Sequence, residues 1–361
     1  QRYEFAHLMK TFSEIYRRAI PLGVANMSLV ALVFTDMFML GQHQLMEMAA
    51  SSILMQAYLV ILVLGEGLVF GFSPLYGQAF GAKNLILRYR TIAAVLGVLF
   101  LYSLIGLLVL ANAGWLAGLI PQTAALEQAS ETYILLLGLS LFPNLLFILT
   151  WELLAFDERE RIVLIGAIFQ FLVNAIANYI LIYGNFGFPE MGIVGAGIAT
   201  LISSSAGMTL LALCYFSKNN GWRHMGTAMC TPLGKLMPIA ARCFRIGLPI
   251  GLTMLVTIGF LSISVIQMAN FGGTAVAAHN AVLQFNEMMV VFALGFAEFA
   301  AIQFAAMNIQ SQAVAVAALR RILIAACALF VPVLILAFLA RPFIGGLFFS
   351  TNDPNYSEAA N

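Results

Sequence analysis

Lysine and arginine are absent from long stretches of this chain and return at intervals between them. The stretches 19–82, 91–158, 162–217 and 246–319 contain no basic residue, whereas 16 of the 17 basic residues fall in the short segments that flank these stretches. In membrane proteins, Lys and Arg accumulate in the cytoplasmic loops. The pattern therefore predicts an all-α, multi-pass membrane protein with a cytoplasmic N-terminus.

The composition excludes a soluble domain of ordinary type. Hydrophobic residues make up 62% of the chain and charged residues only 9%, against roughly a quarter charged in soluble proteins. A crossing needs about 20 apolar residues, which places nine predicted spans in the sequence. These spans are 19–40, 52–74, 92–119, 131–154, 162–184, 194–216, 246–268, 280–306 and 322–345.

The same pattern of landmarks occurs twice, at an offset of 228 residues. Pro21 and Gly23 match Pro249 and Gly251, and other landmarks follow in the same order, such as Gly67 with Gly295. Two repeats of six spans would form two pseudo-symmetric bundles around a central cleft. We predict an N-terminal bundle (1–217), a cytoplasmic connector with an interfacial helix (218–245) and a partial C-terminal bundle (246–361) from which three further spans are missing.

Four polar residues are expected at one depth inside the first bundle. Asp36 lies near the end of span 1, Asn174 and Asn178 are one helical turn apart in span 5, and Thr200 lies in span 6. A charged carboxylate in hydrocarbon costs ~2.5 kcal/mol or more, so an acid in a span indicates function. The set predicts a proton site, or a Na⁺ site at Asp36, Asn174 and Asn178. Hydrogen bonding between helices is the alternative role for the amides and the hydroxyl.

Several motifs occur in order along the chain. They begin with Pro21 and the segment Val33-Phe-Thr-Asp36-Met-Phe-Met-Leu-Gly41. The others are Gly71-Phe-Ser-Pro-Leu-Tyr-Gly-Gln-Ala-Phe-Gly-Ala-Lys83, Asn174-Ala-Ile-Ala-Asn178 and Gly195-Ala-Gly-Ile-Ala-Thr200. Together they resemble the MATE (multidrug and toxic compound extrusion) transporters, in particular the NorM-like bacterial branch. The resemblance implies a twelve-span antiporter with a functional acid at Asp36, polar partners in spans 5 and 6, and bending of span 1 at Pro21. A proline in the first helical turn would instead be unremarkable in structure.

A second set of polar residues lies in spans 2 and 8. Carboxylates there could attract cationic substrates, or they could be paired within a bundle. The family often has a glutamate in span 7, where this chain has Thr257, which favours coupling through Asp36. The candidate substrate-binding or additional acidic residues are Gln56, Glu66, Gln284, Glu287 and Glu298.

Together these features predict a monomeric antiporter of the bacterial inner membrane that exports cationic lipophilic compounds in exchange for H⁺ or Na⁺. The alternative is a lipid-linked oligosaccharide flippase of the same superfamily, which should need cationic side chains in its cavity to hold phosphate. Apart from Arg341, at the outer end of the last span, the nine predicted spans contain no Lys or Arg. No His-Glu-x-x-His motif, metal-ligand spacing or nucleophile with a base occurs, so we expect no enzymatic activity, no cofactor and no nucleic-acid partner.

Overall fold

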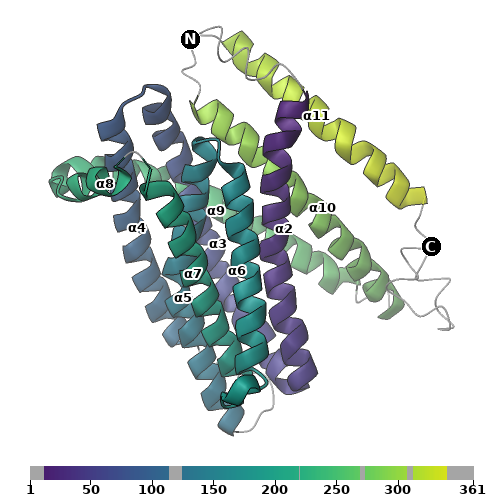
Figure 1. Cartoon of the computed structure of the whole chain (residues 1–361). Helices are drawn as coiled ribbons and strands as arrows, with labels where there is room; N and C mark the ends of the chain where they lie inside the picture. The colour runs from purple at the N-terminus through teal and green to yellow at the C-terminus, as the bar shows by residue number, and fades with distance from the viewer. Residues whose placement is uncertain (1–11, 114–123, 219, 269–272, 307–311, 340–361) are drawn as a thin grey trace. The chain divides into compact units, whose positions relative to one another are not determined.

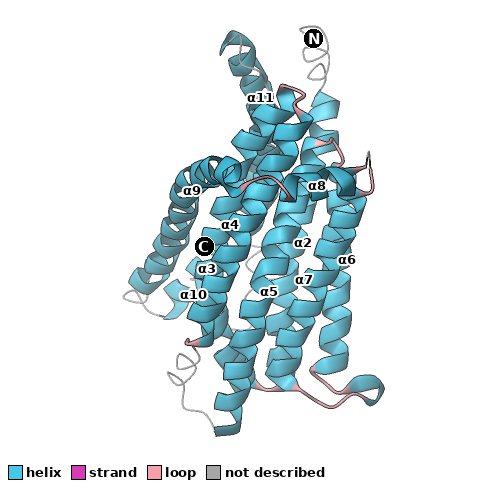
Figure 2. Cartoon of the chain, turned by 90° about the vertical axis from the view of Figure 1, so that its left-hand side faces the viewer, coloured by secondary structure: helices cyan, strands magenta, loops and turns pink. Residues whose placement is uncertain are grey.

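The computed structural model describes residues 12–113, 124–218, 220–268, 273–306 and 312–339, and this part of the chain is helical without a strand (Figures 1 and 2). It divides into two compact units. The larger unit comprises 25–255 and 301–308, and the smaller unit comprises 1–24, 256–300 and 309–361. The helices α2, α9 and α10 each continue from one unit into the other, so the units are not separate segments of sequence.

The helix bounds show how far each element extends beyond its apolar centre. The helices are α2 (Phe12–His43), α3 (Leu45–Gly81), α4 (Leu85–Ala111), α5 (Ala124–Phe156), α6 (Glu160–Leu181), α7 (Gly192–Phe216), α8 (Gly221–Met229), α9 (Leu233–Met268), α10 (Gly273–Ala306) and α11 (Gln312–Leu339), with a short 3₁₀ helix, η2, at Asn185–Gly187.

Nine of the helices in the described residues are long and apolar enough to cross a membrane. This confirms the nine predicted spans, since each predicted span coincides with one of these helices. The ends of two predicted spans, 114–119 and 340–345, lie outside the described residues. The protein is therefore a multi-pass membrane protein.

The segment between the predicted spans 6 and 7 differs from expectation in its helix boundaries. The last part of the predicted connector (218–245) is the beginning of the long helix α9, which continues through Arg242 and Arg245. A separate helix, α8, comes earlier and packs against α4. Charged residues mark where a chain leaves hydrocarbon but do not end a helix, because water and lipid both permit intrahelical hydrogen bonds. The wider domain boundaries at 217 and 245 stay a prediction.

Glycine pairs allow two close helix crossings. In the larger unit, a methyl group at Gly67 of α3 would overlap the backbone of Gly251 in α9. In the smaller unit, a methyl group at Gly295 of α10 would overlap the backbone of Gly23 in α2. Gly67 and Gly295 are 228 residues apart, and so are Gly23 and Gly251, so exchanging the two repeats converts one contact into the other. Small residues permit such close approach between membrane helices.

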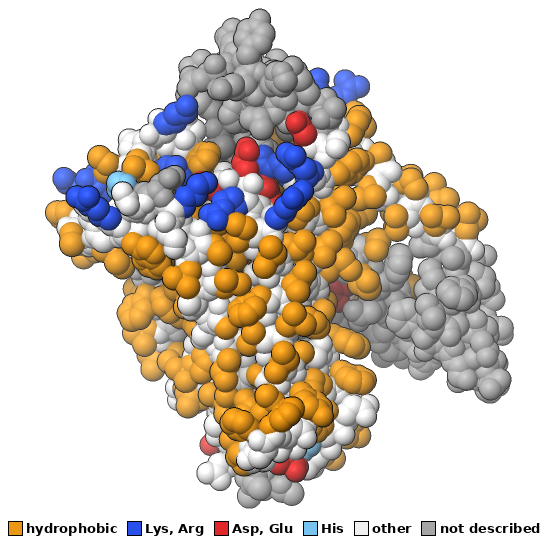
Figure 3. All heavy atoms as spheres, viewed as in Figure 1, with side chains coloured by type: hydrophobic (Ala, Val, Ile, Leu, Met, Phe, Trp, Pro, Cys, Tyr) orange, Lys and Arg blue, Asp and Glu red, His pale blue; other side chains and the backbone are white. Residues whose placement is uncertain are grey.

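The two ends of the bundle α3–α7 differ in charge. The connections after α3, α5 and α7 lie at one end, where Lys and Arg side chains gather above the hydrophobic sides of the helices (Figure 3). We call this the basic end. At the opposite end, residue 44 joins α2 to α3 and residues 182–191 join α6 to α7, and neither connection contains Lys or Arg. Asp36 lies toward this opposite end.

Candidate functional site

Asp36 lies within an apolar stripe of α2. Leu32, Asp36 and Leu40 are spaced by four residues, so they share one face of the helix, and their exposed fractions are 8%, 1% and 0%. The helical period therefore brings a carboxyl group to a position where the neighbouring turns bury leucines. The surrounding helices must supply its hydrogen bonds, because water has almost no access to it.

Both carboxylate oxygens of Asp36 contact donors from other helices. Asn178 Nδ2 in α6 donates to Oδ1 at 2.5 Å. The hydroxyl of Thr200 in α7 lies 3.4 Å from Oδ2 and also donates to the Ala196 carbonyl at 3.0 Å. No ion pair in the described part of the chain includes Asp36. The carboxyl group is thus held by neutral partners only.

The predicted amides form the start of a longer polar row on α6. Gln170, Asn174 and Asn178 are spaced by four residues and are 3%, 0% and 0% exposed. Asn178 Nδ2 also donates to Asn174 Oδ1 at 3.1 Å. Three buried atoms of this row, Asn178 Oδ1, Asn174 Nδ2 and Gln170 Oε1, have no hydrogen-bond partner in the described structure. Buried polar atoms of this kind are uncommon and call for a role.

The polar row continues into α5 and α3. Gln170 Nε2 donates to Asn144 Oδ1 at 3.4 Å, and Asn144 Nδ2 donates to the hydroxyl of Tyr58 at 2.7 Å. Ser140 also donates to the Tyr58 hydroxyl at 3.3 Å. Two groups of uncharged polar partners therefore follow one another along α6, one around Asp36 and one around Tyr58, and no described hydrogen bond joins Asn174 to Gln170 between them.

The structure brings together the four predicted members of the ion site, Asp36, Asn174, Asn178 and Thr200, but not the second set of candidates. Gln56 is exposed and Glu66 half-buried on α3, and neither has a described hydrogen bond to Asp36. Glu287 is exposed and Glu298 half-buried on α10, in the smaller unit. Gln284 lies in α10, but its side chain is outside the described part. Pro21 lies inside α2, in the smaller unit.

Two further buried polar side chains, Glu152 and Gln170, were not among the residues predicted from the sequence. Glu152 of α5 is 3% exposed and accepts a hydrogen bond from Ser73 of α3 at 2.6 Å. It lies inside the predicted span 131–154, so the criterion that selected Asp36 also applies to it. Gln170 continues the four-residue spacing of Asn174 and Asn178, and this period was the signal that could have revealed it.

A contrasting acid lies at the basic end. Asp157 follows α5, and its Oδ1 accepts from Arg88 Nη2 at 3.3 Å. The same Arg88 nitrogen donates to the hydroxyl of Tyr76 at 2.8 Å, and the guanidinium lies 4.4 Å from the ring centroid of Phe80. Tyr76 in turn shares a hydrogen bond of 2.8 Å with Tyr215 of α7. Asp157 therefore has a cationic partner. The cluster of Asp157, Arg88, Tyr76 and Tyr215 connects α3, α4 and α7 to the end of α5.

The donor set of the Asp36 site limits the ions that it fits. No group of three or more His, Cys, Asp or Glu side chains in the described residues is arranged to hold a metal ion. One carboxylate with amide and hydroxyl oxygens suits instead a proton or a hard cation that prefers oxygen ligands. Asn178 presents a nitrogen to Asp36 here; the choice between amide nitrogen and oxygen is an assignment from the hydrogen-bond network.

The chain is similar to known proteins over most of its length. A family model described as MatE matches residues 21–180. The probable multidrug resistance protein NorM of Bradyrhizobium diazoefficiens is 31% identical over 301 residues, covering 80% of this chain and 62% of the relative. NorM of Rhizobium meliloti is 28% identical over 297 residues, covering 78% of this chain and 61% of the relative. The chain thus spans less than two thirds of the length of these curated relatives.

A solved structure shares the fold. An aspartate-to-asparagine variant of the Vibrio cholerae MATE transporter VcmN matches this chain with a TM-score of 0.79 at 17% identity. The match covers 99% of this chain and 78% of the other.

Proposed function

We propose that this chain, which belongs to the MATE family of transporters, acts in a secondary active efflux transporter that exports cationic lipophilic compounds in exchange for H⁺ or Na⁺. The curated relatives are named as probable multidrug resistance proteins, which supports efflux of several compounds. The observation that carries the coupling role is the buried carboxyl group of Asp36, which has neutral partners only.

The charge on Asp36 would couple the ion to the substrate. An uncompensated carboxylate in a site of low polarity binds a cation favourably, whether that cation is a proton, Na⁺ or a charged substrate. Only one of them can neutralise the group at a time. Loading of the coupling ion from outside would therefore release a cationic substrate, and alternating access would come from movement of the two bundles.

Each coupling ion makes a different demand on Asn178. A proton on Asp36 turns one carboxyl oxygen into a donor, for which the unpartnered Asn178 Oδ1 is a fitting acceptor after a flip of the amide. Na⁺ would take the Asp36 carboxylate with the amide oxygens of Asn174 and Asn178 as ligands. Both routes use Asp36 and Asn178, and the Na⁺ route adds Asn174.

The remaining assignments follow from the orientation. We place the basic end of the larger unit in the cytoplasm of a bacterial cell, because cytoplasmic loops collect Lys and Arg. The N-terminus then lies inside, and Asp36 lies near the outer face of the inner membrane.

Pro21 would be a hinge. Its position supports this role, because α2 passes from the smaller to the larger unit one turn later, between Val24 and Ala25. The protein would act as a monomer and without enzymatic chemistry.

Transport in proteoliposomes tests the proposal. The full-length protein is reconstituted, and the movement of a fluorescent lipophilic cation is followed under an imposed proton gradient and, separately, a sodium gradient. We expect one gradient to drive transport in wild type and to fail in Asp36→Asn, because the variant removes the charge and keeps the shape. Glu131→Gln is the control, since this exposed acid lies near the start of α5.

The outcomes separate the candidate functions. Wild-type transport that persists unchanged in Asp36→Asn would contradict the coupling role. No movement under either gradient, from protein that is folded and inserted, would contradict the cation efflux proposal and direct attention to lipid-linked cargo.

A further inference from the structure

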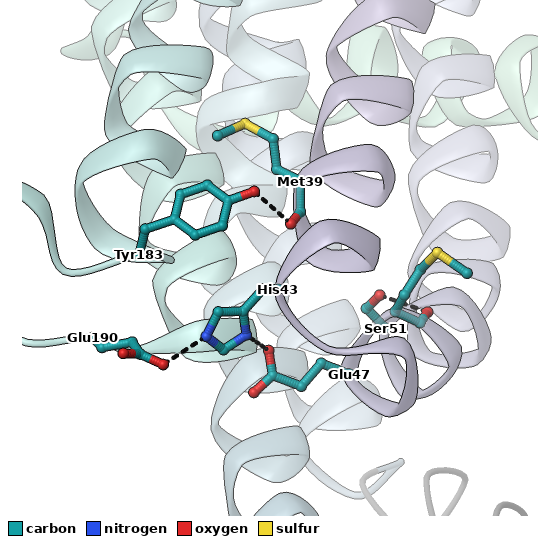
Figure 4. Close-up of polar contacts among 7 residues, drawn as sticks. Met39, His43, Glu47, Ser51, Tyr183 and Glu190 are labelled. Carbon is teal, nitrogen blue, oxygen red and sulfur yellow. Dashed lines mark hydrogen bonds and ion pairs between the residues drawn. The ribbon is translucent and has the colours of Figure 1, made fainter.

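Beyond Asp36, the last two turns of α2 are bonded to neighbouring elements at two positions, Met39 and His43 (Figure 4). The hydroxyl of Tyr183 donates to the carbonyl of Met39 at 2.8 Å. One turn later, His43 lies between two glutamates, Glu47 and Glu190. Tyr183 and Glu190 both come from the connection between α6 and α7, the same two helices that supply the partners of Asp36. The end of α2 is therefore joined to one side of the bundle along its whole outer part.

His43 makes a contact with each of its ring nitrogens. Nδ1 lies 2.9 Å from Glu47 Oε2 in the first turn of α3, and Nε2 lies 2.8 Å from Glu190 Oε1. The side chains of His43 and Glu47 are 10% and 12% exposed, whereas that of Glu190 is 64% exposed. The imidazole thus bridges an acid inside the structure and an acid at its surface.

The connection that carries Glu190 has a defined shape. Its two ends are bonded to each other, because Met191 N donates to the Leu181 carbonyl at 3.0 Å and Gly192 N donates to the Ile182 carbonyl at 3.3 Å. Gly192 has a φ of +52°, and a methyl group there would overlap the carboxylate of Glu47. Glycine suits this point because of its backbone conformation, and a larger residue there would have to displace the carboxylate of Glu47.

The charge of His43 decides how many of these contacts are hydrogen bonds. A protonated imidazolium donates from both nitrogens, whereas a neutral ring has one donor and one acceptor. Carboxylates only accept, so the two glutamates are both satisfied only by the charged ring. The titratable groups that face His43 are Glu47 from α3 and Glu190 and Tyr183 from the α6–α7 connection, with the Tyr183 ring 6.1 Å away between centroids.

We infer that His43, Glu47 and Glu190 form a clamp that positions the outer end of α2, and with it the carboxyl group of Asp36, against α6 and α7. His43 is seven residues after Asp36, so it lies two turns along the same helix face, about 10 Å away. A helical segment this short moves nearly as a rigid body. Opening of the clamp therefore displaces Asp36 from Asn178 and Thr200. The clamp itself does not depend on the proposed function. Only its effect on ion coupling through Asp36 rests on that proposal.

The clamp should respond to pH, because His changes charge between about pH 5 and 8. At acidic pH the charged ring holds both glutamates and the clamp is closed. As the pH rises through the pKa of the ring, one of the two hydrogen bonds is lost. The clamp's contribution to local stability is therefore complete on the acidic side and decreases toward alkaline pH.

Hydrogen–deuterium exchange tests the clamp without reference to transport. Peptides covering residues 36–47 are followed by mass spectrometry in the full-length protein, for wild type and His43→Gln, at about pH 5.5 and about pH 8. We expect about tenfold faster exchange in the variant at the acidic pH, the scale of a lost charge-assisted hydrogen bond. At the alkaline pH the difference should be smaller, because a larger share of the wild-type rings is neutral than at the acidic pH.

Two further variants guard against a merely structural explanation. Glu190→Gln changes an exposed side chain by one atom, so it should fold and still reproduce the faster acidic exchange. His224→Gln removes a histidine of α8 that lies beside the ring of Tyr89 and should leave residues 36–47 unchanged. Equal exchange in wild type, His43→Gln and Glu190→Gln at both pH values would overturn the clamp.

The pH profile of transport then tests the link to Asp36. In proteoliposomes, His43→Gln should change the pH profile of wild type between about pH 6 and 8 while the maximal rate changes less than about threefold. An unchanged profile together with faster exchange would overturn the positioning of Asp36. If wild type transports nothing under any gradient, the proposed function fails, and hydrogen exchange still decides whether the clamp exists.

Discussion

Asp36 and Asp157 lie toward opposite ends of the same unit and have opposite kinds of partners. Asp36 is 1% exposed and held by an amide and a hydroxyl. Asp157 has a side chain that is 23% exposed and lies 3.3 Å from the guanidinium of Arg88. One acid is buried without a cation, and the other is half-buried with one.

Because of this difference, the charge of Asp157 is always balanced by the same cation, whereas the charge of Asp36 is not. The Arg88 guanidinium stays protonated under all physiological conditions, so Asp157 keeps a permanent partner and its pairing stabilises the basic end. The neutral partners of Asp36 leave its charge to be balanced by whatever cation arrives. The same residue type therefore suits coupling at one end and structure at the other.

The largest expected effect comes from neutralising the two acids in parallel. Asp36→Asn should lower ion-driven transport to about one hundredth of wild type or less, the scale of losing a proton-transferring side chain, with thermal stability unchanged or raised. Asp157→Asn should retain most transport and melt at a lower temperature. Transport in proteoliposomes and thermal unfolding in detergent measure the two effects, and a reversed assignment of the losses would break the comparison.

The second-largest effect is expected on stability, when Arg88, the cationic partner of Asp157, is replaced. Arg88→Gln loses its contacts with Asp157, Tyr76 and the ring of Phe80, and we expect a destabilisation of about 1–3 kcal/mol. The matched control is Arg161→Gln, because Arg161 is exposed at the start of α6. Equal melting temperatures for the two variants would show that the Arg88 cluster is not a structural element.

Replacing an amide of α6 should reduce the apparent affinity for the coupling ion more strongly the closer that amide lies to Asp36. Asn178→Ala removes the donor to Asp36, and we expect about a tenfold loss in the apparent affinity for the coupling ion. Asn174→Ala removes only the neighbour of that donor, and about a threefold loss is expected. Transport rates measured across a series of ion concentrations give both values. An equal or greater loss for Asn174→Ala would favour Na⁺ over H⁺ as the coupling ion, because only the Na⁺ route uses the amide oxygen of Asn174 as a ligand.

The smallest effect is expected at Thr200. Its contact with Asp36 is 3.4 Å long, and its hydroxyl already donates to the Ala196 carbonyl. Thr200→Val keeps the shape and should change apparent ion affinity by about threefold at most, in line with ~0.6 kcal/mol for a hydrogen bond between membrane helices. A loss comparable to that of Asp36→Asn would identify Thr200 as an essential ligand and would sharpen the list of partners.

Much of the candidate site was accessible from residue spacing. Asn174 and Asn178 share a helix face, and their distances from the end of their span place them at the depth of Asp36 and Thr200. The structure joins Asp36 to Asn178 although 142 residues separate them. The pairing of His43 with Glu190, across 147 residues, had no comparable signal, because both residues lie at helix ends or in a connection where no periodic pattern operates.

The sequence by itself determined the number of crossings, the predicted repeat and the depth of the polar layer, because partition between bilayer and water acts on each segment separately. Only the tertiary structure decided which donors face Asp36, that Gly67 meets Gly251, and that His43 bridges two glutamates. Those contacts are directional and short, so they depend on how the backbones of distant helices approach one another. Hydropathy and helical period carry no information about that approach.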